Sequence, residues 1–161
     1  MDILKDKIDN FFKWVQGTQL VELDFINVKD DPVRPELDLK FRTSYNRKIY
    51  GLKYKDAIEG IVCVAFTNDI PQSVKELDLM SQNAYLKKDA TIAVAYTVWS
   101  RKRGAGKEII HKAISFLKND KKIKKVVTLS PLSPVATHFH IRNQAKLISI
   151  NPTTQNFEYK I

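Results

Sequence analysis

An apolar segment that runs into a basic, glycine-containing turn and then directly into an amphipathic helix constrains the fold of this chain more than any other feature. The apolar segment covers residues 91–99, and the turn after it reads Arg101-Lys102-Arg103-Gly104-Ala105-Gly106-Lys107. Between 105 and 117 apolar residues recur with a helical period, and the β-branched segment 126–129 is typical of a buried strand. A strand, a turn, a helix and a second strand in this order predict a βαβ unit.

The turn of this unit has the properties of a binding site for a pyrophosphate. Glycine lets the backbone turn tightly and approach a ligand, and the first N–H groups of a helix have no partner within the helix. The residues expected to bind the ligand are Val98, Arg101, Lys102, Arg103, Gly104, Ala105, Gly106 and Lys107. A tight strand-to-helix connection with solvated basic side chains shows the same Gly-x-Gly pattern. The prediction of a phosphate site therefore depends on the strand and the helix that flank the turn.

The rest of the chain predicts a single α/β domain over residues 1–161, of the α+β type, in which helices flank a mixed and largely antiparallel sheet. A length of 161 residues is usual for one domain. Helical periods occur at 1–17, 70–80 and 134–143, and strand patterns at 20–28, 38–43, 48–53, 58–67, 146–150 and 156–160. The amphipathic helix at 1–17 is expected to pack its apolar side on the domain.

Charge and cysteine content narrow the class of protein. The net charge of +9 favours a polyanionic partner, either nucleic acid or the phosphates of a nucleotide-like cofactor, but no nucleic-acid-binding motif accompanies the charge. A second basic cluster at 118–125 is more typical of a solvated turn than of a ligand site. The single cysteine, Cys63, lies in an apolar strand pattern, which favours core packing over nucleophilic chemistry. We therefore expect a cytoplasmic protein without a metal site or a membrane segment.

Serines and histidines are concentrated in the segment 128–145. Ser130 ends a predicted strand next to the one that enters the glycine turn, and ligands of α/β folds collect at the carboxyl edge of such strands. His140 lies on the following helix, which begins at Ser133-Pro134, on a face that can look into a cleft beside Ser130. The spacing alone favours structural roles, with Ser130 bonded to a strand end and His140 satisfied by backbone.

The sequence resembles two related families. The turn Arg101-x-x-Gly104-x-Gly106 resembles the acyl-coenzyme A site of the GNAT acetyltransferase superfamily. Over about residues 38–161 the chain resembles the catalytic domain of malonyl-CoA decarboxylase, which has a GNAT-like fold. The most specific matching segments are Leu129-Ser130-Pro131 and Phe139-His140-Ile141-Arg142-Asn143-x-Ala145, and the closing Asn156-Phe157-x-Tyr159 also looks like that family.

The resemblance to malonyl-CoA decarboxylase implies a site and a reaction. It implies Ser130 and His140 as the catalytic pair, Glu108 and Asn143 as nearby support, and Tyr159 as a weaker candidate. The implied reaction converts malonyl-CoA to acetyl-CoA and CO₂ without a metal. The matching segments imply a shortened relative, without the family's long helical amino-terminal domain.

The sequence departs from the decarboxylase pattern at two positions, and because of these departures two other functions remain alternatives. Gln144 stands where the family has glycine, and the glycine turn is one residue shorter. One alternative is acyl transfer from acetyl-CoA to an amine, with Glu108, His140 or Tyr159 assisting proton movement. Another is a non-catalytic protein that uses its basic surface on nucleic acid or a protein partner.

Overall fold

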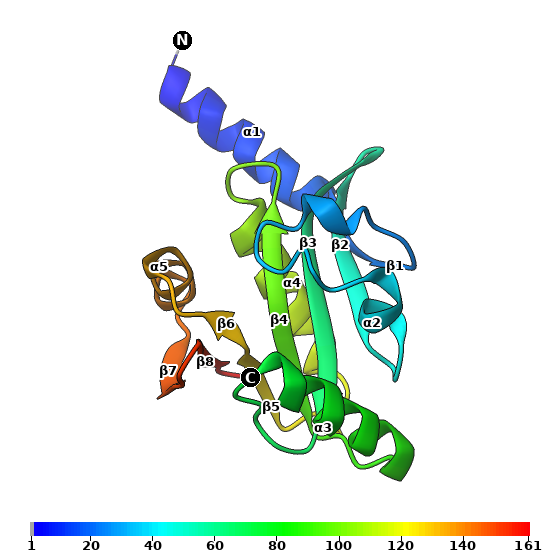
Figure 1. Cartoon of the computed structure of the whole chain (residues 1–161). Helices are drawn as coiled ribbons and strands as arrows, with labels where there is room; N and C mark the ends of the chain where they lie inside the picture. The colour runs from blue at the N-terminus through cyan, green and yellow to red at the C-terminus, as the bar shows by residue number, and fades with distance from the viewer. Residues whose placement is uncertain (1) are drawn as a thin grey trace.

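All strands of the chain join one mixed sheet, and helices lie on both of its faces (Figure 1). The computed structural model describes residues 2–161. In chain order the elements are α1 (Ile3–Gly17), β1 (Thr18–Leu23), a 3-10 turn (Val28–Asp30), α2 (Leu39–Thr43), β2 (Lys48–Tyr54), β3 (Ala57–Thr67), α3 (Val74–Lys87), β4 (Ile92–Ser100), α4 (Ala105–Leu117), β5 (Lys125–Thr128), β6 (Ser130–Pro131), α5 (Pro134–Arg142), β7 (Lys146–Ile150) and β8 (Thr154–Tyr159). The predicted α/β class with a largely antiparallel sheet is confirmed.

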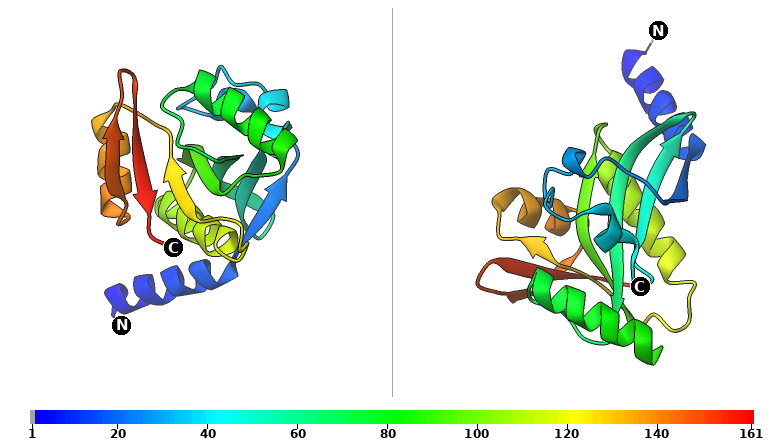
Figure 2. Two further views of the ribbon diagram at one scale, coloured as in Figure 1. Left: turned by 90° about the horizontal axis from the view of Figure 1, so that it is seen from below. Right: turned by 45° about the vertical axis from the view of Figure 1, so that its right-hand side comes forward.

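The sheet is antiparallel except at its centre. The strand order is β1-β2-β3-β4-β5-β8-β6, with β7 paired to β8, and within residues 2–161 only β4 and β5 run parallel. The helix α4 connects these two strands, so the predicted βαβ unit is present. Figure 2 shows α3 and α4 on opposite sides of the sheet.

The core lies on both faces of the sheet, because β3 is buried on both sides. Val62 and Val64 pack in a cluster with α4, whereas Ile61 and Cys63 pack in a cluster that includes Leu77 of α3. Side chains of a strand alternate between faces, so an uninterrupted apolar strand is expected where helices cover both. Cys63 is fully buried, and burial raises the pKa of its thiol to about 11, which fits the predicted core role.

Two of the predicted strand ranges are wrong. Residues 38–43 form the short helix α2, because the Asp38 carboxylate accepts a hydrogen bond from the Phe41 N–H at 2.8 Å and so caps a helix start. The strand predicted at 20–28 is β1, which ends at Leu23 and gives way to a loop. The helix predicted at 70–80 begins after the cap residue Ser73 and continues to Lys87.

The helix α1 projects from the sheet (Figures 1 and 2), and most of its apolar side chains are exposed. Trp14 is its buried residue, and the indole Nε1 donates to Glu59 Oε2 at 2.6 Å. Exposed apolar residues of α1 are Ile3, Leu4, Ile8, Phe11 and Phe12. The expectation that the apolar side packs on the domain is therefore wrong for these residues. Met1, which the predicted range 1–17 included, lies outside the described residues.

None of the helices formed by residues 2–161 has the length and apolar character that crossing a bilayer requires.

The residue Gln144 ends α5 in a left-handed conformation, with φ +73°. Its N–H donates to the Ile141 carbonyl and the Ala145 N–H donates to the His140 carbonyl, each at 3.0 Å. These two bonds form a Schellman motif, in which glycine is the preferred residue at the left-handed position. The backbone conformation thus gives a physical reason for the glycine that the decarboxylase pattern has at this position.

Replacing Gln144 with glycine is expected to raise the free energy of unfolding by about 1 kcal/mol, because glycine adopts a positive φ without a Cβ clash. Urea unfolding of the variant measures the change. Gln144→Ala is the matched control, since alanine shortens the side chain but keeps the Cβ, and it should give no gain. Equal stabilities of the glycine and alanine variants would contradict the prediction.

Candidate functional site

The parallel strands β4 and β5 part at their carboxyl ends, and this split forms the candidate site. They pair only from Ile92 opposite Lys125 to Ala95 opposite Thr128. Beyond these pairs β4 continues to Ser100, whereas β5 has ended. Beyond Ala95 the two strands therefore do not pair with each other, which leaves room for a ligand between them.

A bulge at Tyr96 bends β4 where the strands part. In the register of β3 with β4, Val64 lies opposite Ala95 and Cys63 lies opposite Thr97, so Tyr96 is an extra residue. A bulge takes one residue out of the ladder and increases the local twist of the strand. The sequence of residues 91–99 does not indicate this bulge, because the segment contains no glycine or proline.

The buried side chain of Arg34 bridges the two parted strands. Its Nε donates to the Tyr96 carbonyl at 2.8 Å, and its Nη2 donates to the Leu129 carbonyl at 3.0 Å. Burial lowers the pKa of the guanidinium, and the nearby carboxylates of Glu36 and Asp31 oppose this shift. Arg34 thus fixes the backbone on both sides of the split, a role that its position in a proline-containing loop did not indicate.

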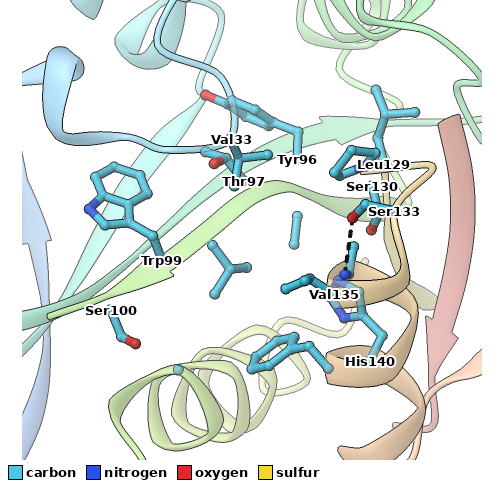
Figure 3. Close-up of a pocket in the computed structure, with 16 residues that line it drawn as sticks. Val33, Tyr96, Thr97, Trp99, Ser100, Leu129, Ser130, Ser133, Val135 and His140 are labelled. Carbon is cyan, nitrogen blue, oxygen red and sulfur yellow. Dashed lines mark hydrogen bonds between the residues drawn. The ribbon is translucent and has the colours of Figure 1, made fainter. Parts of the chain in front are cut away.

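The split opens into a mainly apolar cavity of about 220 Å³ (Figure 3). The polar residues that line it include Thr97, Ser100, Ser130, Ser133 and His140. In Figure 3 the residues Ser130 and His140 lie on one side of the cavity, and Trp99 and Ser100 lie on the other. The structure therefore brings the sequence-predicted pair Ser130 and His140 to one cavity, although they come from different elements.

The imidazole of His140 is buried, and among residues 2–161 it has one hydrogen-bond partner. Its Nδ1 lies 2.7 Å from the Tyr159 hydroxyl, and the ring packs against Phe157 at 5.0 Å between centroids. Burial lowers the pKa of His140 to about 4, so the imidazole is neutral near pH 7. Burial also raises the pKa of the Tyr159 phenol, which keeps its proton. Tyr159 contacts His140 but is not among the residues that line the cavity, so it can affect a ligand there only through His140.

The hydroxyl of Ser130 belongs to a second polar pair. Its Oγ lies 2.8 Å from Thr128 Oγ1, and this threonine oxygen also accepts a hydrogen bond from the Phe157 N–H. Because a hydroxyl has one proton and two lone pairs, Ser130 keeps capacity for a ligand. Among residues 2–161 no hydrogen bond joins Ser130 directly to His140. The two residues line the same cavity independently of each other.

Two of the predicted supporting residues lie away from the cavity. The carboxylate of Glu108 is 3.8 Å from Lys112 Nζ, which donates to the Thr18 carbonyl at the start of β1. Asn143 is buried and donates through Nδ2 to the Phe139 carbonyl at 2.8 Å, which satisfies the end of α5. Neither residue is part of the cavity lining.

The glycine turn leads into α4 at the same end of the sheet. Gly104 has φ +88°, a conformation that favours glycine, and it caps α4 without a side-chain hydrogen bond. The Ala105 N–H donates to the Lys102 carbonyl, whereas the amides of Gly106 and Lys107 have no acceptor within residues 2–161. These amides are the ones that a phosphate at the helix start would meet.

The start of α4 is continuous with the cavity. Gly106 and the half-buried Val98 both line the cavity. A Cβ on Gly106 would lie 3.1 Å from a ring carbon of Phe139, so glycine here also permits α5 to approach α4. The second glycine of the turn therefore has a packing reason in addition to its predicted role.

The basic side chains of the turn do not all face a ligand. Arg101 makes an ion pair with Asp30 at 2.7 Å, and Lys102 Nζ lies over the Trp14 ring at 4.6 Å. Arg103 and Lys107 are exposed and make no ion pair within the described part of the chain. Of the predicted cationic residues, these two have charges that are available for a phosphate.

No group of three or more His, Cys, Asp or Glu side chains among residues 2–161 is arranged to hold a metal ion.

Comparison with known proteins rests on solved structures. No protein-family model matches the chain, and no curated protein sequence matches it. Malonyl-CoA decarboxylase from Agrobacterium vitis matches with a TM-score of 0.76 at 18% identity, over 98% of this chain and 64% of that chain. A Bacillus subtilis acetyltransferase in complex with CoA matches with a TM-score of 0.62 at 11% identity, over 89% of this chain and 99% of that chain. A GNAT family acetyltransferase from Elizabethkingia anophelis with acetyl-CoA bound matches with a TM-score of 0.56 at 12% identity, over 90% and 99%.

The chain has a GNAT-like fold. The expected likeness to malonyl-CoA decarboxylase is confirmed at the level of the fold, and the chain spans 64% of the length of the decarboxylase structure from Agrobacterium vitis.

Proposed function

We propose that the chain is an enzyme that binds an acyl-CoA thioester and decarboxylates malonyl-CoA, or a closely related malonyl thioester. One observation carries this proposal: Ser130 and His140 line a mainly apolar cavity that also reaches Gly106 at the start of α4. A thioester in the cavity and a diphosphate at the helix start can therefore belong to one extended ligand. In this proposal the backbone amides of Gly106 and Lys107 and the side-chain charges of Arg103 and Lys107 bind the diphosphate.

The chemistry of decarboxylation suits this cavity. The bond between the carboxylate carbon and the central carbon of the malonyl group breaks, CO₂ leaves, and the electron pair becomes an enolate on the thioester oxygen. Fixed donors that point at this oxygen lower the barrier most effectively in a site that excludes water. The apolar walls disfavour the charged carboxylate and favour its loss as neutral CO₂.

His140 and Ser130 supply the donors in this proposal. The Tyr159 hydroxyl, which keeps its proton, lies 2.7 Å from Nδ1 of His140. In the proposed mechanism it donates to Nδ1, which puts the proton of the neutral imidazole on Nε2. Nε2–H and the Ser130 hydroxyl stabilise the enolate oxygen. The enolate carbon then takes a proton from one of these groups, and water returns a proton to that group, so both side chains regain their starting state. The hydroxide left by the water combines with the released CO₂ to give bicarbonate.

Acyl transfer from acetyl-CoA to an amine is the second candidate. The match over 99% of the length of two acetyltransferases favours it. Here the neutral imidazole of His140 would use its other tautomer, in which Nδ1–H donates to the Tyr159 oxygen and Nε2 accepts a proton from the attacking amine. This reaction requires an acceptor, whereas decarboxylation requires only the free malonyl carboxylate.

Thermal unfolding with CoA tests the binding step. At a CoA concentration of 100 times Kd, we expect the melting temperature to rise by about 5–10 °C. Gly104→Glu should abolish this rise, because it places a negative charge at the start of α4. The matched control is Gly104→Lys, which has the same strained φ and the opposite charge, and it should keep the rise. If CoA does not shift the wild-type protein at millimolar concentration, acyl-CoA binding is excluded.

Release of labelled CO₂ tests the reaction. Malonyl-CoA labelled in its free carboxylate should lose the label when incubated with the wild-type protein alone. Acetyl-CoA incubated with a panel of amines should show no release of free CoA above the rate without amine. Amine-dependent release without CO₂ would replace the decarboxylase by the acyltransferase.

A further inference from the structure

A second candidate site lies at the end of the sheet opposite the glycine turn. The strand β4 starts at Ile92 beside Lys125 and ends at Ser100, so the connection from α4 to β5 and the glycine turn lie at opposite ends of the strand. Two surface hollows flank this connection. One has a volume of about 480 Å³ and the other a volume of about 450 Å³, each larger than the cavity that Ser130 lines.

The hollows are rich in lysine. The larger one is lined by Lys48, Lys88 and Lys122, and the smaller one by Lys124, Lys125, Lys146 and Lys160. We call these residues the lysine face. Because residues 120–123 line the first hollow and 124–125 line the second, the two hollows are adjacent along the chain.

Few carboxylates balance the lysine face. Asp120 and Glu158 are the acidic residues that line the two hollows. Lys48 lies 3.6 Å from Glu22, and the other lysines of the face are exposed and make no ion pair within residues 2–161. Gathered lysines without partners repel one another, and a polyanion removes this repulsion while it releases its own counterions.

An aromatic pair lies in the larger hollow. Tyr45 and Tyr85 pack edge to face with ring centroids 6.0 Å apart, and they are 37% and 52% exposed. Tyr45 is held in a left-handed backbone conformation, with φ +55°, and its ring also lies 5.2 Å from the guanidinium carbon of Arg47. Exposed tyrosines beside lysines provide a surface on which unpaired bases stack, which a bare cluster of lysines does not.

We propose that the lysine face, with Tyr45 and Tyr85, binds single-stranded nucleic acid. The lysines contact the phosphates along the strand, and the tyrosines stack on its bases. Single strands are favoured over duplexes because stacking on a side chain requires an exposed base. They are favoured over an anionic membrane because the tyrosines line a hollow rather than a protruding edge. This site is separate from the acyl-CoA cavity and does not depend on the proposed reaction.

Fluorescence anisotropy with a labelled 12-nucleotide oligouridylate tests the proposal. We expect saturable binding that weakens as salt rises, with a slope of about 0.7 per phosphate contacted. Lys122→Glu combined with Lys124→Glu should weaken binding by at least about tenfold. The matched control is Lys5→Glu combined with Lys7→Glu in α1, which makes the same change in net charge away from the lysine face and should leave binding within about twofold.

The tyrosines distinguish stacking from simple charge attraction. Tyr85→Ala should weaken oligouridylate binding by about 5- to 150-fold, in line with the loss of one stacked base, and should leave binding of inorganic polyphosphate unchanged. An equal loss in the α1 control would overturn the proposal. So would wild-type binding to phosphatidylserine vesicles without binding to the oligonucleotide, unchanged affinity of Tyr85→Ala, or no binding at all.

Discussion

Replacing Arg42 with methionine is expected to lower the free energy of unfolding by about 3–5 kcal/mol, because it leaves a buried carboxylate without its partner. The side chains of Arg42 and Asp31 are both fully buried, and Arg42 Nη1 donates to Asp31 Oδ2 at 2.8 Å. Arg42 also donates to the carbonyls of Leu37 and Arg34. Methionine fills much of the space but donates to none of these groups.

The Arg42 network also holds the candidate site in place. Asp31 accepts hydrogen bonds from the Arg34 N–H and the Thr97 hydroxyl at 3.0 Å, and Arg34 in turn bridges the parted strands. Loss of Arg42 therefore removes support from both sides of the cavity. We expect the loss of stability to be accompanied by a weaker effect of CoA on the melting temperature.

Urea unfolding measures the effect of Arg42→Met. The matched control is Lys40→Met, which makes the same substitution at an exposed position of the same short helix and should change stability by less than about 0.5 kcal/mol. A loss of less than about 1 kcal/mol for Arg42→Met would show that the buried pair is not a main support of this fold.

Local patterns in the sequence predict the centre of this fold well. The βαβ unit was predictable because its strand and helix have different apolar periods and because glycines mark the turn between them. Ser133 followed by Pro134 predicts a helix start, and in the structure Ser133 Oγ accepts the Ala136 N–H at 3.1 Å (Figure 3). These features depend on residues within a few positions of one another, which is the range that a pattern covers.

Features that depend on distant contacts could not be predicted in this way. Residues 38–43 show strand-like alternation, but Arg42 is buried by partners in a loop and in β3 rather than by a sheet face. Lys102 lies over the ring of Trp14, which is distant in the sequence, and for that reason its charge is not part of the proposed phosphate site. For the candidate site, the spacing of Ser130 and His140 favoured structural roles, and only the resemblance to malonyl-CoA decarboxylase predicted them as a pair. The same resemblance also implied a supporting role for Glu108, whose carboxylate lies beside Lys112 and away from the cavity.

Replacing His140 with alanine is expected to reduce the rate of malonyl-CoA decarboxylation by about 10²–10⁴-fold. In the proposed mechanism the reaction depends on a fixed donor at Nε2, and alanine has none. Binding of CoA should persist, because the diphosphate site at the start of α4 does not include His140. A radiometric CO₂ assay and the CoA-dependent melting temperature, measured on the same variant, separate the two effects.

Two further variants guard against a loss of structure. His138→Ala lies on the same helix at an exposed position and should keep the wild-type rate. Tyr159→Phe removes the hydroxyl that bonds to Nδ1 and should lower kcat with little change in KM, because it frees the tautomer of His140 without altering the cavity wall. Wild-type turnover by His140→Ala would place the chemistry at another residue.

The pH dependence gives an independent test of the state of His140. A pKa of about 4 means that the imidazole is neutral at every pH well above 4, so the rate should stay constant from pH 8 to pH 5. An unperturbed histidine, with a pKa of about 6.5, would be largely protonated at pH 5. A fall in rate centred near pH 6.5 would therefore mean that the imidazole is exposed to water during turnover. The mechanism requires the opposite, because only a dry cavity both neutralises His140 and favours the loss of a carboxylate as CO₂.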